Sequence, residues 1–309
     1  MYHPQLNRII VKAVSRLIAA MSQTAPFMAA QVTPWLKQLA GGNQPEDYFK
    51  HPLAFPSLLL PWWLERTIHP EPDLGFQTDL VYSTINGYYY IRLIDNLMDG
   101  QATVELELLP ALGFFHTQFQ TVYQTYFAGD HPFWDQFNTI WLHSAEVAMQ
   151  DAGLTGIDEA EFTRIAAHKV CAAKIPLVAI CYRYERSDLA EPWFRLVDLL
   201  GCWHQFLNDL MGWYRDDTRQ TYTYFLAEAA RSRVDAEPLV RWVAREGFDW
   251  ATGKLESWMI ALKELAVELH SPELAHYLDT RDQMLETQQA EVTAGLRNLM
   301  KLLELDQSR

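Results

Sequence analysis

Apolar residues recur every three to four positions along most of the chain, which is the spacing of helices that bury one face. No stretch alternates strictly between apolar and polar residues, so the pattern predicts no β-strand. Pro and Gly residues divide the pattern into separate helices. After residue 78 we expect helices at about 79–99, 110–127, 133–151, 158–185, 192–217 and 280–305, with one or two more before the last.

The first 45 residues contain no Asp or Glu and predict an amphipathic helix. Arg8, Lys12 and Arg16 recur every four residues on one face, and an apolar face that includes Val11 and Val14 lies beside them. This pattern favours a first helix packed on the core with a solvated basic face. An organelle-targeting segment or a segment that lies on a membrane surface is the alternative.

The segment 46–78 is rich in Pro and irregular, so we expect short helices and loops there, with Trp62 and Trp63 as core anchors. Pro176 falls inside the helix expected at 158–185 and should kink or break it, because proline lacks a backbone donor. We find no repeat and no linker. The sequence therefore predicts one all-α domain, 1–309, of about ten helices.

Composition narrows the class of protein. The chain of 309 residues is 49 % hydrophobic, enough for a large core, and its 25 Lys and Arg against 39 Asp and Glu give a net charge of −14. This acidic balance argues against a nucleic-acid partner. Three cysteines without a CxxC pair indicate buried thiols in a reducing compartment. No apolar run has the length of a membrane span. We expect a cytoplasmic protein, with peripheral membrane contact as an alternative.

The helix expected at 79–99 ends in a row of polar residues, the first polar segment. Its four members are spaced i, i+4, i+7 and i+11 and share one helical face: Tyr88, Arg92, Asp95 and Asp99. Asp95 and Asp99 are one turn apart, close enough to bind the same Mg²⁺ ion or neighbouring ions through carboxylate oxygens. Arg92 can pair with either carboxylate or contact a phosphate. The alternative is a solvated acidic stripe near a helix end.

A second polar segment runs along the helix expected at 192–217. Its members are Gly201, Gln205, Asn208, Gly212, Asp216 and Arg219. They lie beside a broad apolar face, which favours the wall of a polar cavity over a solvated face. Gly212 costs a helix interior about 1 kcal/mol relative to Ala, so we expect a ligand or backbone to approach it closely. The helix dipole disfavours a carboxylate at Asp216 unless a cation, such as a metal ion, offsets it.

Together the two segments resemble those of the class I isoprenoid synthase superfamily. The first is similar to the Y-x-x-x-R-x-x-D-D-x-x-D signature of squalene and phytoene synthases, with Asn96 replacing the second Asp. The second resembles the N-D-x-x-S-x-x-x-E motif of terpene cyclases through Asn208 and Asp216, with Gly212 replacing Ser or Thr. It also resembles the Q-x-x-N-x-x-x-D-x-x-x-D segment of squalene and phytoene synthases, in which Gly212 replaces the first Asp.

The resemblance implies an isoprenoid synthase fold, a single-domain antiparallel helical bundle around a central apolar pocket, with the two segments facing each other at its mouth. The implied catalytic and metal-binding residues, which would hold three Mg²⁺ ions with the substrate diphosphate, are Asp95, Asp99, Asn208 and Asp216. The implied diphosphate contacts are Arg92, Lys169, Arg215 and Arg219. The implied pocket residues are Tyr88, Gln205, Gly212 and Tyr222. Lys169 and Lys174 point about 140° apart on a helix, so we expect only one of them to contact the diphosphate, and Lys169 is preferred.

The leading hypothesis is an Mg²⁺-dependent class I terpenoid synthase, a transferase or carbon–oxygen lyase, that ionises an allylic prenyl diphosphate. The first segment favours head-to-head condensation of the carbocation, and the second favours its cyclisation. The alternative is a non-catalytic relative or partner subunit that binds a prenyl diphosphate, and a third reading is an unrelated helical scaffold. The sequence assigns no chain length, product, NADPH requirement or oligomeric state.

Overall fold

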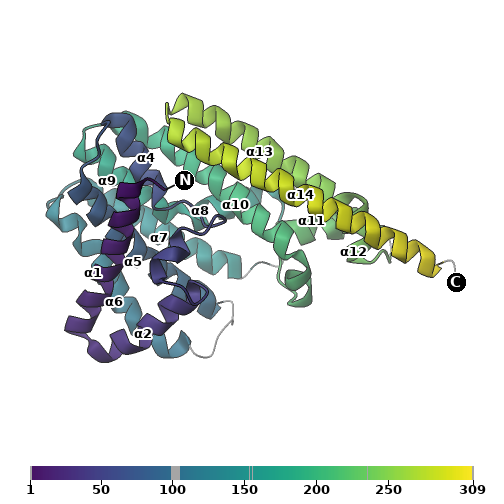
Figure 1. Ribbon diagram of the computed structural model, residues 1–309, viewed down its shortest axis with the longest axis horizontal. Helices are drawn as coiled ribbons and strands as arrows, with labels where there is room; N and C mark the ends of the chain where they lie inside the picture. The colour runs from purple at the N-terminus through teal and green to yellow at the C-terminus, as the bar shows by residue number, and fades with distance from the viewer. Residues whose placement is uncertain (1, 99–104, 153, 155, 235, 308–309) are drawn as a thin grey trace. The chain divides into compact units, whose positions relative to one another are not determined.

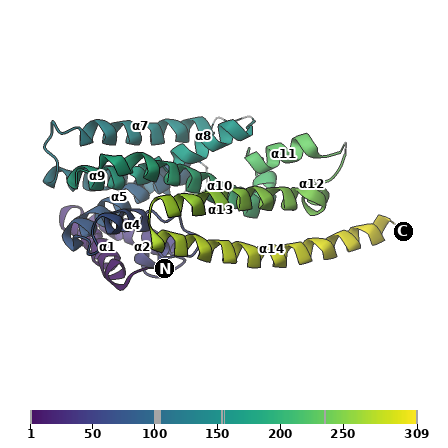
Figure 2. The ribbon, with the colours of Figure 1, turned by 90° about the horizontal axis from the view of Figure 1, so that it is seen from above.

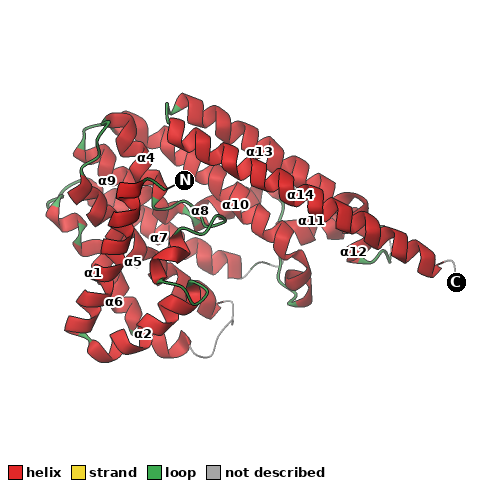
Figure 3. Ribbon diagram, in the orientation of Figure 1, coloured by secondary structure: helices red, strands yellow, loops and turns green. Residues whose placement is uncertain are grey.

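The computed structural model describes residues 2–98, 105–152, 154, 156–234 and 236–307, with C-terminal side chains as far as residue 295. Every regular element in these residues is helical, which confirms the predicted all-α class (Figure 3). The α-helices are α1 (Pro4–Thr24), α2 (Pro26–Leu39), α3 (Pro45–Phe49), α4 (Leu59–Ile68), α5 (Leu74–Met98), α6 (Ala111–Thr121), α7 (Phe133–Ala152), α8 (Glu159–Lys169), α9 (Lys174–Arg183), α10 (Ala190–Thr218), α11 (Tyr224–Ser232), α12 (Leu239–Trp242), α13 (Phe248–Glu268) and α14 (Pro272–Gln307). The shorter turns are η1 (Glu105–Leu108), η2 (Tyr123–Thr125), η3 (Cys171–Ala173), η4 (Ser187–Leu189) and the π-helical η5 (Val243–Gly247).

The chain divides into two compact units. Unit 1 consists of Met1–Ala152 and Val170–Phe194, and unit 2 consists of Gly153–Lys169 and Arg195–Arg309. Neither unit is continuous in sequence, and the division falls inside α10. The prediction of a single domain over 1–309, with a central apolar pocket, stays a prediction.

Helix α5 is the centre of unit 1, where α1 and α6 both pack against it (Figure 1). Gly87 permits the close approach of α6, because a Cβ added there would lie 2.9 Å from the ring of Phe119. Helix α1 buries the apolar face that the pattern predicts, although Val11 is 43 % exposed. Arg8 and Lys12 are exposed. Arg16 is paired with Asp79 of α5, at 2.6 Å.

Helix α5 begins before the expected residue 79. The carboxylate of Asp73 accepts hydrogen bonds from the backbone N–H groups of Gly75 and Phe76, both at 3.0 Å, and so caps the helix. The bond from Phe76 is the first cause of a lowered pKa at Asp73. This local cap adds more than a turn to the helix that carries the first polar segment.

The region expected as one helix at 158–185 is divided before Pro176. Helix α8 ends at Lys169, and α9 begins at Lys174 after the turn η3. Pro176 lies in the first turn of α9, where a backbone N–H has no intrahelical partner, so proline fits without breaking the helix. The expected break at Pro176 is therefore wrong in position. The described residues hold fourteen α-helices against the predicted number of about ten, and this division, together with the short α3 and α12, accounts for most of the difference.

A buried carboxylate links three elements of unit 1. Glu65 of α4 is fully buried, as are the predicted anchors Trp62 and Trp63 of the same helix. Its carboxylate accepts hydrogen bonds from the Asp73 backbone N–H at 2.9 Å, from Gln77 Nε2 at 2.5 Å and from the Tyr184 hydroxyl at 2.5 Å. These donors offset the cost of burying a charged group, which would otherwise be several kcal/mol.

In unit 2, α13 and α14 lie side by side (Figures 1 and 2). An aromatic cluster joins the other helices to α13: the ring of Phe162 lies 5.7 Å from Phe206, 5.0 Å from Tyr224 and 6.1 Å from Trp258. This aromatic part of the core of unit 2 is thus built from side chains of α8, α10, α11 and α13.

Two further predictions concern cysteines and membrane spans. Cys171, Cys181 and Cys202 are buried, as predicted, and burial raises the pKa of Cys181 and of Cys202 to about 12. In the part of the chain that is described, no single helix has the length and hydropathy of a membrane span. By length and composition alone the bent pair Glu159–Lys169 and Cys171–Arg183 passes that test. Residues 175–181 of that pair are buried inside the protein.

Candidate functional site

The first polar segment occupies the last turns of α5, in unit 1. Nη1 of Arg92 lies 3.3 Å from Oδ2 of Asp95, and the two side chains are 33 % and 36 % exposed. The buried Nε of Arg92 has no hydrogen-bond partner among the described residues. A guanidinium has five N–H donors, so Arg92 retains donors for an anion while it holds Asp95.

Tyr88 belongs to an aromatic cluster that joins α3 to α5. Its hydroxyl is hydrogen-bonded to the hydroxyl of Tyr48, and its ring centre lies 5.3 Å from the ring centres of Tyr48 and Phe49. Burial first, and the Tyr48 hydroxyl second, raise the pKa of Tyr88 well above its usual value. Tyr88 is therefore neutral and ties α3 to α5. Its role as a pocket residue stays a prediction.

The residues next to Asp95 differ in burial. Asn96, which stands at the second Asp of the signature that the first segment resembles, is only 5 % exposed. Asn96 shares a helical face with Tyr89 and Leu93, which are both fully buried, whereas Asp95 points about 100° away from that face. Asp99 lies outside the described residues, and its place beside Asp95 stays a prediction.

The described part of the first segment fits Mg²⁺. Mg²⁺ is often bound by one or two carboxylates together with phosphate oxygens and waters, and Asp95 offers a partly exposed carboxylate. Among the described residues, no group of three or more His, Cys, Asp or Glu side chains is arranged to hold a metal ion. Phosphate oxygens and waters are the further ligands that Mg²⁺ commonly takes beside such a carboxylate.

The second polar segment lies on α10, in unit 2, and its residues differ in exposure. Nε2 of Gln205 donates to Oδ1 of Asp209 at 2.9 Å, and Asp209 is 4 % exposed. Asn208, between them, is exposed. Asp216, two turns further on, is 7 % exposed. The predicted stripe therefore runs from buried to exposed positions and back and does not form one uniform surface.

Asp216 is engaged by its neighbour. Nε of Arg215 donates to Oδ1 of Asp216 at 3.0 Å. A Cβ added at Gly212 would lie 2.6 Å from Nη2 of Arg215 and 3.0 Å from Oδ2 of Asp216. Arg215 thus supplies the cation that a carboxylate at this end of α10 requires. The second segment does not fit a metal ion: Gly212 has no donor atom, and the carboxylate of Asp216 is buried in an ion pair.

The remaining predicted residues are dispersed around α10 and α8. Arg219 lies just beyond the end of α10, and Tyr222 is 57 % exposed in the connection to α11. Lys169 is the last residue of α8 and is partly buried, in unit 2. Lys174 lies in unit 1, with Nζ 5.1 Å from the ring centre of Phe194. Nothing in this arrangement favours Lys174 over Lys169 as a diphosphate contact.

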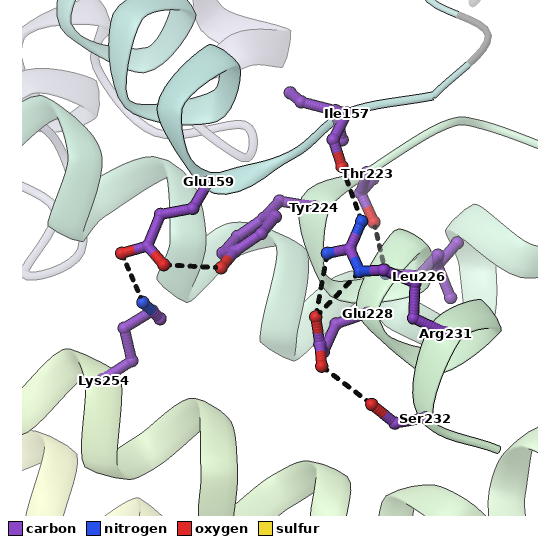
Figure 4. Close-up of polar contacts among 9 residues, drawn as sticks. All are labelled: Ile157, Glu159, Thr223, Tyr224, Leu226, Glu228, Arg231, Ser232 and Lys254. Carbon is purple, nitrogen blue, oxygen red and sulfur yellow. Dashed lines mark hydrogen bonds and ion pairs between the residues drawn. The ribbon is translucent and has the colours of Figure 1, made fainter.

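A polar network fixes the chain just after the second segment (Figure 4). The Thr223 hydroxyl accepts a hydrogen bond from the backbone N–H of Leu226 at 3.3 Å and caps α11. Glu159 of α8 accepts from Nζ of Lys254 at 2.6 Å and from the Tyr224 hydroxyl at 3.3 Å. Burial first, and the Glu159 charge second, raise the pKa of Tyr224. These contacts join α8, α11 and α13 within unit 2.

Sequence reasoning missed two contacts of the site. Tyr48, the partner of Tyr88, lies in the Pro-rich region and carries no local signal, because the contact spans 40 residues. The contact of Arg215 with Gly212 could have been predicted. Gly212 precedes Arg215 by three residues within one helix, and helical side chains tilt towards the N-terminus.

The sequence matches no known protein family and no curated protein. Among solved structures, the chain is similar to a geranylgeranyl pyrophosphate synthetase from the archaeon Geoglobus acetivorans. The TM-score is 0.65 at 13 % sequence identity, over 92 % of this chain and 99 % of that chain. This likeness shows that the chain has the all-α isoprenoid synthase fold, as predicted.

Proposed function

We propose that this protein is an enzyme of isoprenoid metabolism that uses Mg²⁺ to ionise an allylic prenyl diphosphate. One observation carries the proposal: in a chain with the isoprenoid synthase fold, α5 ends in a partly exposed pair of Arg92 and Asp95. The solved neighbour is named for a prenyl pyrophosphate, which supports the same substrate class.

In this proposal the residues of the first segment have separate roles. Asp95, with Asp99, holds Mg²⁺, which would act as a Lewis acid on the diphosphate oxygens. Arg92 donates to the diphosphate through the N–H groups that Asp95 leaves unused, and its charge offsets the negative charge of the departing group. Aromatic side chains near the prenyl chain would stabilise positive charge through their π faces.

Incubation of the purified chain with C10 to C20 prenyl diphosphates and Mg²⁺, followed by mass spectrometry, tests the proposal. Dimeric prenyl products indicate head-to-head condensation, and monomeric hydrocarbons or alcohols indicate cyclisation or hydrolysis. Longer prenyl diphosphates from a mixture with isopentenyl diphosphate indicate chain elongation. No product and no released pyrophosphate with any chain length would contradict the proposed activity.

The incomplete metal motif of the second segment favours one other function, that of a non-catalytic protein that binds prenyl diphosphates. Gly212 lacks a ligand atom, and Asp216 is held in an ion pair, so the second metal motif is incomplete. A binder without activity would show a raised melting temperature with a prenyl diphosphate and no release of pyrophosphate. An enzyme would show both effects.

A further inference from the structure

Gly212 leaves a space on α10 that the guanidinium of Arg215 fills. Helical side chains tilt towards the N-terminus, so the side chain of residue 215 lies over the turn that contains residue 212. A Cβ at residue 212 would lie 2.6 Å from Nη2 and 3.3 Å from Cζ of Arg215, which is too close for the guanidinium to remain in place. Only glycine therefore accepts this position of Arg215.

In the ion pair of Arg215 and Asp216, the aspartate is largely buried and the arginine is exposed. The Asp216 side chain is 10 % exposed, whereas that of Arg215 is 61 % exposed. Only Nε of Arg215 donates to Asp216, at 3.0 Å, and its two Nη groups make no hydrogen bond to another described residue. The carboxylate thus orients the guanidinium, and the two Nη groups remain as a fork of donors.

We propose that Arg215 takes the place of a metal ion in the second polar segment, so that this segment binds the substrate diphosphate through the guanidinium without Mg²⁺. The inference rests on the proposed function for its ligand. A guanidinium fork matches two oxygens of a phosphate group, and its charge does not depend on pH or on a bound ion. Asp216 is then a positioning residue for Arg215 and does not ligate a metal.

Isothermal titration calorimetry of the full chain with inorganic pyrophosphate, in EDTA and in excess Mg²⁺, tests this assignment. We expect the unmodified chain to bind pyrophosphate in EDTA. Arg215→Gln should weaken this metal-independent binding by about tenfold or more, because a charged hydrogen-bond donor is lost. Arg195→Gln removes an exposed arginine from the same helix, where it pairs with Glu268, and should leave the affinity within about twofold.

Two substitutions at residue 212 distinguish the displacement of the Arg215 guanidinium from the addition of an oxygen that can bind a metal ion. Gly212→Ala displaces the guanidinium without adding an oxygen, so binding in EDTA should weaken and Mg²⁺ should not restore it. Gly212→Ser displaces the guanidinium and adds a hydroxyl, so binding in EDTA should weaken while binding in Mg²⁺ recovers. Circular dichroism shows whether each variant is folded, and Arg215→Gln, at an exposed position, provides the independent test.

The failure of this inference and the failure of the proposed function give different results. If pyrophosphate binds only with Mg²⁺ and Asp95→Asn abolishes that binding, the inference is overturned and the proposed function stands. If Arg215→Gln leaves binding in EDTA within twofold, the inference is likewise overturned. If pyrophosphate binds in neither condition, the proposed function fails together with the inference.

Discussion

The two polar segments each pair an arginine with an aspartate, but the surroundings of the two aspartates differ. In the first segment, the side chain of Asp95 is 36 % exposed and lies 3.3 Å from Arg92. In the second, the side chain of Asp216 is 10 % exposed and lies 3.0 Å from Arg215. A helical spacing decides which residues share a face, but the burial of that face decides whether a carboxylate is available to a ligand.

This difference separates two chemical roles. A metal ion at Asp216 would have to reach a carboxylate that is 10 % exposed and already paired with Arg215, whereas the carboxylate of Asp95 is 36 % exposed. The comparison supports the proposals that the first segment binds a metal ion and that the second binds an anion directly. Three predictions compare the surroundings of the two segments, in order of expected effect.

The largest expected effect is on catalysis. Asp95→Asn should lower the rate of pyrophosphate release by about a hundredfold or more and raise the Mg²⁺ concentration needed for half the maximal rate, because a metal ligand loses its charge. Asp216→Asn should lower the rate by less than about tenfold and leave the Mg²⁺ dependence unchanged. Asp217→Asn, at the exposed neighbouring position, is the matched control. Equal shifts in Mg²⁺ dependence for Asp95→Asn and Asp216→Asn would contradict the comparison.

The next effect is a difference in how acid changes folding stability: a histidine on the helix of the second segment titrates, whereas the tyrosines around the first segment do not. Partial burial, and then the charge of Arg281, lower the pKa of His204 on α10 from 6.5 to about 4. As the pH falls, the unfolded chain therefore binds this proton before the folded one, and the stability present above pH 6.5 is lost between about pH 6.5 and 4.

At pH 5 this single group should lower the free energy of unfolding by about 2 kcal/mol relative to pH 8. Urea unfolding of the unmodified chain and of His204→Gln at both pH values isolates the effect, since the variant lacks the titrating group. Around the first segment, Tyr88 and Tyr89 have raised pKa values and stay neutral across this range. An equal loss of stability in both chains would exclude His204 as the cause.

The smallest effect concerns the hydrogen bond between Tyr48 and Tyr88 that supports the first segment. Tyr48→Phe and Tyr88→Phe should each lower the free energy of unfolding by about 1 kcal/mol, because each leaves the other hydroxyl without its partner. The double variant should lose less than the sum of the two single losses, since no unpaired hydroxyl remains. Additive losses in urea unfolding would show that the two hydroxyls act independently.

The elements that sequence could predict are those set by local chemistry. The core face of α1, the helical class and the anchors Trp62 and Trp63 follow from periodicity and composition. The start of α5 was also within reach, because Asp73 is a common capping residue. The division before Pro176 was not, since the pattern continues across η3 and only the packing of α8 and α9 into different units separates them.

The positions of the site residues could be predicted from the sequence, but their burial and their long-range contacts could not. Spacing placed Arg92 beside Asp95, and the structure brings them together. It did not distinguish the exposed Asn208 from the buried Asp216, because burial depends on which helices cover α10. Contacts over long sequence separations, such as Tyr48 with Tyr88, have no local pattern.

Glu65 has a consequence for the order in which the chain can fold during synthesis. One of its three donors, Tyr184, lies 119 residues further along the chain, so the carboxylate lacks this third partner until α9 and the residue after it have been made. By then the ribosome has already produced α8, which belongs to unit 2. Unit 1 therefore cannot be completed on the nascent chain before synthesis of unit 2 has begun, and a product truncated before α9 should be a substrate for chaperones and proteases.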